Sequence, residues 1–259
     1  MTPELLSIGL VSLFASFLTF FSGFGLGTLL LPVFMFFFST ESSITLTAIV
    51  HLSNNLFKTS LTYKDINYNV IKRFGITSII GAIAGSFILV KLAIYFSEFN
   101  YKILQTTFTT SVLKITIGGI IFIFTILEFI HLDQWINPNK RTLLLGGLIS
   151  GVFGGISGHQ GALRTLFLSK LKLSKFSFIS SGIAIALLID ISRIPIYFNN
   201  LKLQDFSTGI ESAVVAVATA FIGAVLGNKF LKKIKINSLY KIVSICLILF
   251  SLSFALGII

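Results

Sequence analysis

The chain consists of long apolar stretches that follow one another with only short polar connections. Each stretch has the length of a membrane span, which needs about 20 apolar residues. A backbone inside a bilayer must satisfy its own hydrogen bonds, so stretches of this kind form helices. We therefore expect an all-α polytopic membrane protein of about eight helical segments. The apolar stretches lie at 5–38, 44–62, 74–93, 111–131, 143–170, 176–198, 207–228 and 238–258.

Charge is scarce and mostly basic. Hydrophobic residues make up 54% of the chain and charged residues 11%, which is too little charge to cover a water-soluble fold. The formal net charge is +11, but most basic residues stand in the short connections, where they orient a membrane protein and contact anionic lipid headgroups. We therefore expect the lipid bilayer as a partner and no nucleic acid. The single cysteine, Cys246, cannot form an internal disulfide, and Met1 to Glu4 lacks the basic residues of a cleavable signal peptide.

Two of the stretches are interrupted by glycine. The first contains Ser22-Gly23-Phe24-Gly25-Leu26-Gly27, and the fifth holds seven glycines between Gly146 and Gly161. We interpret each as two short helices joined at a break, marked by Gly25 and Gly158, because broken helices in paired positions recur in transporters. The alternative is one long kinked helix whose glycines allow tight helix packing.

The two halves of the chain resemble each other. A shift of 135 residues places Ser22-Gly23 on Ser157-Gly158, Asn55 on Asp190 and Lys58 on Arg193. A shift of 142 residues places the Gly-Ala patch at 81–85 on the one at 223–227. We interpret 1–131 as a first transmembrane repeat, 132–142 as a connecting loop and 143–259 as a second transmembrane repeat.

Basic residues in the connections indicate how the repeats lie in the membrane, because cytoplasmic loops collect Lys and Arg. If each broken stretch is a re-entrant hairpin, 13 basic residues fall inside and 3 outside, so this arrangement is preferred over a single crossing. It makes the second half inverted relative to the first. The 13 are Lys64, Lys72, Arg73, Lys140, Arg141, Lys170, Lys172, Lys175, Lys229, Lys232, Lys233, Lys235 and Lys241, and the 3 are Lys91, Lys102 and Lys202.

Four polar residues gather in the second stretch. His51, Asn55 and Lys58 are spaced i, i+4 and i+7 and share one helical face, while Asn54 lies one turn from Lys58. The stripe indicates a polar lining of a transport pathway. The alternative is a snorkelling lysine with ordinary interhelical hydrogen bonds.

Asp190 and Arg193 stand at the equivalent positions of the second half. Their i, i+3 spacing allows them to pair on one helix. A structural ion pair and a substrate-binding arginine are therefore both open interpretations.

The second break favours an anion. A helix that starts after Gly158 would direct its N–H groups and positive dipole end at the break. His159 and Gln160 lie in this segment, and Arg164 offers a planar fork suited to oxyanions. Lys58, Arg164 and Arg193 against Asp190 leave the interior net positive, which favours an anionic substrate.

The segments Gly23–Pro32 (GFGLGTLLLP), His51–Lys58 (HLSNNLFK) and Gly154–Arg164 (GGISGHQGALR) resemble those of the sulfite exporter TauE/SafE family. The resemblance covers nearly the whole chain. It implies a bacterial-type plasma-membrane permease of about eight helices in two related halves, with sulfite, sulfoacetate or other organosulfonates as substrates. The chain departs from the family pattern at His159-Gln160, where more glycine is expected.

The sequence therefore predicts a permease for a small anion, working by alternating access, with no cofactor. The expected substrate-binding residues are Gly25, His51, Asn54, Asn55, Lys58, Gly158, His159, Gln160, Arg164, Asp190 and Arg193. An anion channel remains an alternative, as does an intramembrane enzyme acting on a lipid or isoprenoid with His51 or His159 as base, although no hydrolase, metal or phosphate-loop motif accompanies it. Both histidines are also candidates for proton coupling.

Overall fold

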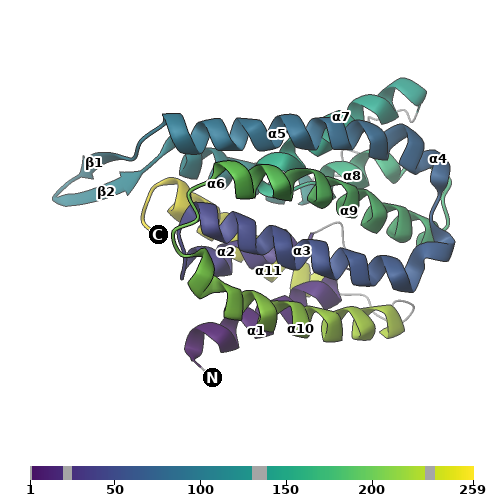
Figure 1. Cartoon of the computed structure of the whole chain (residues 1–259), viewed down its shortest axis with the longest axis horizontal. Coiled ribbons are helices and arrows are strands. Elements are labelled where there is room, and N and C mark those ends of the chain that lie inside the picture. The colour runs from purple at the N-terminus through teal and green to yellow at the C-terminus, as the bar shows by residue number, and fades with distance from the viewer. Residues whose placement is uncertain (1, 20–24, 130–138, 231–236) are drawn as a thin grey trace.

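The protein is a bundle of helices with one protruding β-hairpin (Figure 1). The computed structural model describes residues 2–19, 25–129, 139–230 and 237–259. The elements of the first half are α1 (Pro3–Leu18), α2 (Leu26–Met35), α3 (Thr40–Thr62), a 3-10 turn (Tyr63–Asp65), α4 (Tyr68–Val70), a π-helical turn (Ile71–Gly75), α5 (Ile76–Tyr95), β1 (Phe99–Ile103), β2 (Thr106–Thr110) and α6 (Val112–Phe129). Those of the second half are α7 (Lys140–Ser157), α8 (Gly161–Leu168), α9 (Lys175–Asn200), α10 (Phe206–Phe230) and α11 (Asn237–Ala255).

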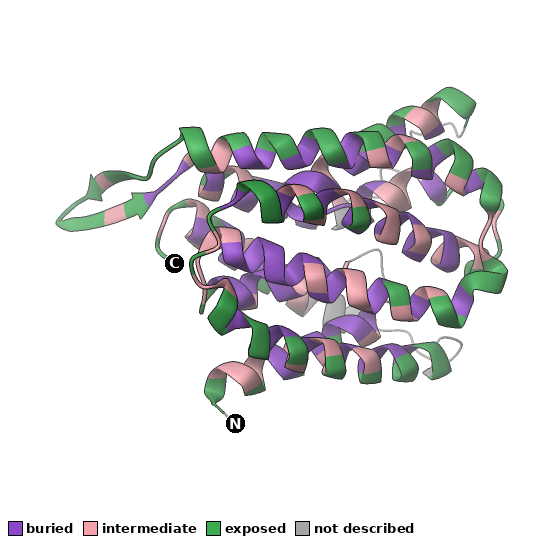
Figure 2. Ribbon diagram, viewed as in Figure 1, coloured by how far each residue is buried: buried purple, intermediate pink, exposed green. Residues whose placement is uncertain are grey.

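The helices suit a membrane. Those at Tyr68–Tyr95, Lys175–Asn200 and Phe206–Lys229 are long and apolar enough to cross one. Large apolar side chains such as Phe14, Ile80 and Val214 are more than half exposed, and Figure 2 shows exposed residues along the outer faces of the bundle. An apolar exterior of this extent belongs against lipid, so the chain is a multi-pass membrane protein.

The two ends of the bundle are identified by contacts between connections. At one end Ser39 N donates to Asp205 Oδ2 at 3.0 Å, and the β-hairpin is tied to the C-terminal segment, where Tyr101 Oη donates to the Leu256 carbonyl. We call this the hairpin end. At the opposite end Asn67 N donates to Ser181 Oγ at 2.9 Å, and we call it the basic end. Of the 13 basic residues expected inside, Lys232, Lys233 and Lys235 lie outside the described residues.

The first broken stretch starts and finishes at the hairpin end. Ser212 Oγ donates to Glu4 Oε1 at 2.5 Å, which holds the start of α1 beside the start of α10. Helix α2 then runs back along α3 to Met35, close to Ser39. Residues 20–24, which contain Ser22, Gly23 and Phe24 of the expected break, lie outside the described residues.

The second broken stretch starts and finishes at the basic end. Gly146 in α7 lies against the Phe167 ring in α8, and Leu143 and Leu168 share a buried cluster with Phe74. Each broken stretch is therefore a pair of antiparallel short helices, and the two pairs enter the bundle from opposite ends.

Helices of one half pack on helices of the other in matched pairs. Helix α1 packs on α10 and α7 packs on α5, while α3 contacts α9 and α6 contacts α11. The Gly-Ala patches form the α5–α7 and α1–α10 contacts: a Cβ on Gly81 would overlap the Leu148 carbonyl in α7, and one on Gly223 would overlap the Leu13 carbonyl in α1. Small residues thus let α1 approach α10 closely and let α7 approach α5 closely.

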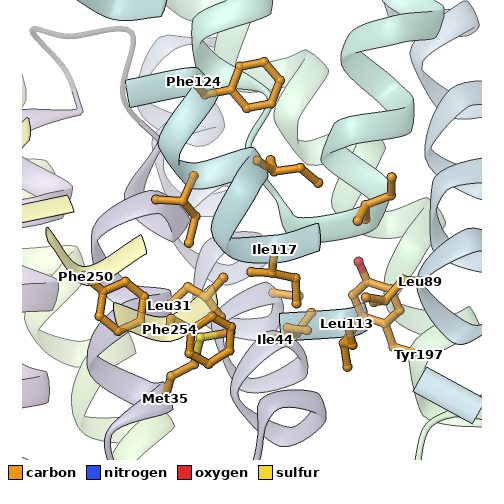
Figure 3. Packing of buried hydrophobic residues seen from close by; sticks show 14 of the residues in the cluster. Leu31, Met35, Ile44, Leu89, Leu113, Ile117, Phe124, Tyr197, Phe250 and Phe254 are labelled. Atoms are coloured by element: carbon orange, nitrogen blue, oxygen red, sulfur yellow. The ribbon is translucent and has the colours of Figure 1, made fainter. Parts of the chain in front are cut away.

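A buried apolar cluster fills the bundle between the centre and the hairpin end. Figure 3 shows Leu31, Ile44, Ile117 and Tyr197 among the side chains gathered there from α2, α3, α6 and α9. Along α3 the cluster residues Ile44 and Ala48 precede the polar stripe that begins at His51. The cluster therefore separates the polar stripe from the hairpin end.

Two features differ from the sequence predictions. The β-hairpin of β1 and β2 is a small exception to the all-α fold; its strands pair in register from Phe99↔Thr110 to Ile103↔Thr106 and are rich in the threonine and aromatic residues that favour strands. In addition, α7 begins at Lys140, inside the expected connecting loop 132–142, because Asn139 forms a capping box with Thr142.

Candidate functional site

Two short helices begin at the same place in the bundle. Helix α2 starts after Gly25 and α8 starts after Gln160, and neither start is capped by a side-chain hydrogen bond. The first-turn N–H groups of a helix have no intrahelical partners and carry the positive end of its dipole. Gly25, Leu26, Gln160 and Gly161 all line one polar cavity of about 30 Å³.

Most of the remaining cavity lining is polar or basic. Lys58 from α3 and Arg164 from α8 are the two charged side chains there, and none of the described lining residues is acidic. The cavity is therefore a positive site at which two helix N-termini and two cations converge. Its other lining residues are Thr19, His51, Asn54, Asn55, Ile183 and Ala186.

Several polar atoms beside this cavity have no hydrogen-bond partner among the residues that the structure describes. Asn54 Nδ2 is buried without a hydrogen bond, although Asn54 Oδ1 accepts one from Ser16 Oγ at 2.9 Å. Gln160 Nε2 and Oε1 are likewise buried and unpaired. Buried polar atoms are rarely left without partners, so the two amide NH₂ groups are candidate donors to a bound molecule.

Asp190 is the acceptor at the centre of a buried polar network next to the cavity. His51 Nδ1 lies 2.6 Å from Asp190 Oδ2, and Asn55 Nδ2 donates to the same oxygen at 3.1 Å. Arg193 donates to Asp190 Oδ1 from Nε at 3.0 Å and from Nη2 at 2.8 Å. Asp190 and Arg193 are fully buried partners, and neither lines the cavity.

Lys58 and Arg193, which the 135-residue shift makes equivalent, lie at equivalent places. Lys58 Nζ donates to the Ser16 carbonyl at 3.0 Å and to Thr19 Oγ1 at 2.5 Å, at the C-terminus of α1. The Arg193 guanidinium lies against Gly158, at the C-terminus of α7. A cation at a helix C-terminus offsets the dipole and the unpaired carbonyls there, so each cation stabilises the broken helix of its own half. Lys58 is 2% exposed and does not snorkel.

The two breaks differ in backbone conformation. Gly158 has φ 81°, in the left-handed region that favours glycine. Gly25 has φ −82° and ψ 149°, which any residue adopts. The backbone at this position therefore does not require glycine, contrary to the expectation from the sequence. A Cβ on Gly25 would meet His51 Nε2 at 3.7 Å, an ordinary contact.

His159 is buried between α7 and α8 but is not a lining residue of the cavity. Its Nδ1 lies 3.0 Å from Ser157 Oγ, and its Nε2 has no partner. The structure thus brings seven of the expected site residues to one cavity and places Gly158, His159, Asp190 and Arg193 beside it. The seven are Gly25, His51, Asn54, Asn55, Lys58, Gln160 and Arg164.

Sequence reasoning missed Thr19 and Ser16, which anchor Lys58 and Asn54. They stand in an apolar helix without a motif. Within the described part of the chain, no three His, Cys, Asp or Glu side chains are grouped to hold a metal ion.

The sequence profile of the family described as Sulfite exporter TauE/SafE matches residues 8–254, nearly the full length. The chain belongs to this family. No match was found among curated proteins or among solved structures. TauE/SafE proteins are membrane transporters of sulfur-containing anions, so membership identifies the chain as a membrane transporter and is consistent with the expectation that it is not an enzyme.

Proposed function

We propose that this TauE/SafE protein carries a small sulfur-containing anion, such as sulfite or a sulfonate, across a bacterial-type plasma membrane by alternating access. The observation that supports this most is the convergence of the α2 and α8 N-termini on a cavity lined by Arg164 and Lys58. Helix N-termini bind oxyanions through backbone N–H groups, and an arginine fork adds charge-assisted hydrogen bonds.

Arg164 would be the direct anion ligand. Its guanidinium lies on α9 at Gly182, where a Cβ would meet Nε at 3.0 Å, and the absence of a side chain at Gly182 leaves it room. Asn54 and Gln160 would add amide donors, because their NH₂ groups are unpaired. Lys58, held by the end of α1, would contribute positive charge rather than a fork.

Asp190 and Arg193 would hold the site together without touching the anion. Their ion pair neutralises Asp190, the one buried acid among the described residues, and leaves the cavity positive. We propose that the two halves form an inverted repeat, which is supported by the matched packing of α1 on α10 and of α7 on α5. Inverted repeats with broken helices at their interface are common in transporters.

Alternating access is supported by two features. The cavity of about 30 Å³ holds only a few water molecules, so an anion requires the surrounding helices to separate. The apolar cluster around Leu31, Ile117 and Tyr197 would close the path to the hairpin end. Movement of the α1–α2 and α7–α8 helix pairs against the α3–α9 pair would open the path to one end of the bundle and close the path to the other end.

Uptake of ³⁵S-labelled sulfite into proteoliposomes tests the proposal. We expect saturable uptake that unlabelled sulfite and small sulfonates inhibit, and no unitary current in planar bilayers. Unitary currents carried by the anion would instead establish the channel alternative. Absence of flux for every sulfur anion tried, in vesicles shown to contain folded protein, would refute the proposal.

A further inference from the structure

His51 lies between the buried carboxylate and the anion cavity. On one side its Nδ1 lies 2.6 Å from Asp190 Oδ2. On the other side the ring lines the cavity, and Nε2 faces the start of α2, where a Cβ on Gly25 would lie 3.7 Å away. His51 is 4% exposed, so no bulk water competes for either nitrogen.

The hydrogen bonds fix which nitrogen can accept a proton. The Asp190 carboxylate only accepts, so Nδ1 carries the hydrogen that joins the two groups. The Asn55 amide, 3.1 Å from the same oxygen, also donates to Asp190. Nε2 is left as the basic nitrogen. It lies 3.4 Å from Asn55 Nδ2 and faces the start of α2, where the helix N-termini would hold an anion. Protonation there would add both a donor and a positive charge to the anion site.

The charges around His51 make proton and anion binding mutually dependent. Helix α9 places Asp190 and Arg193 near His51. Helix α8 contributes Arg164, and α3 contributes Lys58 two turns after His51. His159 lies at the junction of α7 and α8. Asp190 already shares its charge with Arg193. An added proton on His51 would therefore increase the net positive charge of the site, and an anion in the cavity would offset that charge.

We propose that His51 Nε2 binds a proton that travels with the anion, so that the transporter moves the anion and one proton in the same direction. This inference rests on the proposed function and adds the coupling ion to it. Histidine is the side chain that ordinarily changes charge near neutral pH. By linkage, a proton that strengthens anion binding is itself bound more tightly when the anion is present.

Calorimetric binding to purified protein, in buffers of differing ionisation enthalpy, counts the protons taken up with each anion. The probes are methanesulfonate, which does not titrate between pH 5 and 8, and sulfite. We expect the wild-type protein to take up about one proton per anion at the alkaline end of this range, and its affinity to rise by up to about tenfold per unit fall in pH. His51→Gln, which keeps an amide donor for Asp190, should bind without this uptake.

A matched substitution is available at the other described histidine. His159→Gln removes a buried imidazole outside the cavity and should keep the proton uptake of the wild type. If His51→Gln does not fold, His51→Asn takes its place as the test of which residue binds the proton. The wild-type measurement with methanesulfonate tests by itself whether a proton is taken up with the anion.

The outcomes separate the two proposals. Anion binding without proton uptake in the wild-type protein would overturn the coupling and leave the transport function intact. Equal uptake by wild type and His51→Gln would also overturn it. No binding of either anion at any pH would overturn the proposed function, and the coupling with it.

Discussion

Asn55 and Asp190, which stand at equivalent positions under the 135-residue shift, are hydrogen-bonded to each other: Asn55 Nδ2 donates to Asp190 Oδ2 at 3.1 Å. Equivalent positions of two related units meet only close to the axis that relates them. The contact therefore supports a symmetric origin for the centre of the bundle. The two halves differ here in chemistry, because one supplies a neutral amide and the other a carboxylate.

Arg164 is predicted to bind the anion directly. Arg164→Gln should weaken sulfite binding by roughly tenfold to a hundredfold, the loss of one charge-assisted hydrogen bond worth about 1.5–3 kcal/mol. Arg164→Lys should also bind weakly, because an ammonium cannot reproduce the planar fork. Calorimetry on detergent-solubilised protein measures both. Lys172→Gln, at an exposed cation of the basic end, is the control and should bind as the parent does.

The Asp190–Arg193 pair is predicted to stabilise the fold rather than to bind the anion. Either Asp190→Asn or Arg193→Gln alone leaves a buried charge without its partner, which costs about 3–5 kcal/mol. The double variant should recover most of the lost thermal stability. Thermal unfolding of the three variants checks this. A double variant no more stable than the weaker single variant would show that the two residues act independently.

Lys58 is predicted to hold the end of α1. Lys58→Met removes the donor to the Ser16 carbonyl. The carbonyl stays buried without this hydrogen bond, which lowers the free energy of unfolding by about 1–3 kcal/mol. The variant should therefore unfold at lower temperature than the parent even without substrate. A variant with unchanged stability but weakened anion binding would make Lys58 a substrate ligand alone.

The sequence predicted the helical stretches, both breaks and most of the cavity lining because these depend on local chemistry: apolar length, glycine and isolated polar residues. It left open whether Arg193 forms a structural ion pair or binds the substrate. Only the fold shows that the Arg193 guanidinium donates to Asp190 and does not line the cavity. It could not place Thr19 or Ile183, because their role depends on which helices become neighbours. The β-hairpin was missed because its short strands lie between two long apolar helices.

Replacement by alanine is predicted to destabilise the protein at Gly158 but not at Gly25. Gly158→Ala forces a Cβ into a left-handed conformation, which costs about 1–2 kcal/mol, and brings it against the Arg193 guanidinium. Gly25→Ala requires neither and should fold normally. Comparing the unfolding temperatures of the two variants tests this, and equal destabilisation would contradict it.

We predict that the basic end of the bundle faces the cytoplasm and that the hairpin end faces outside. In a Cys246→Ser background, Leu104→Cys at the tip of the β-hairpin, where Leu104 is 96% exposed, should react with an impermeant thiol reagent added outside whole cells. Lys64→Cys at the basic end should react only after the cells are opened. The reverse pattern would invert the proposed topology, and labelling of both from outside would contradict the assignment of the two ends.

The anion site itself is tested most directly by locating a bound anion. Selenite resembles sulfite and scatters anomalously at the selenium edge, so crystals of the wild-type protein grown with selenite would place it. We expect one anomalous peak within hydrogen-bonding distance of the Arg164 guanidinium and of the first turns of α2 and α8. A peak elsewhere in the bundle, or none in a protein that still transports selenite, would contradict it.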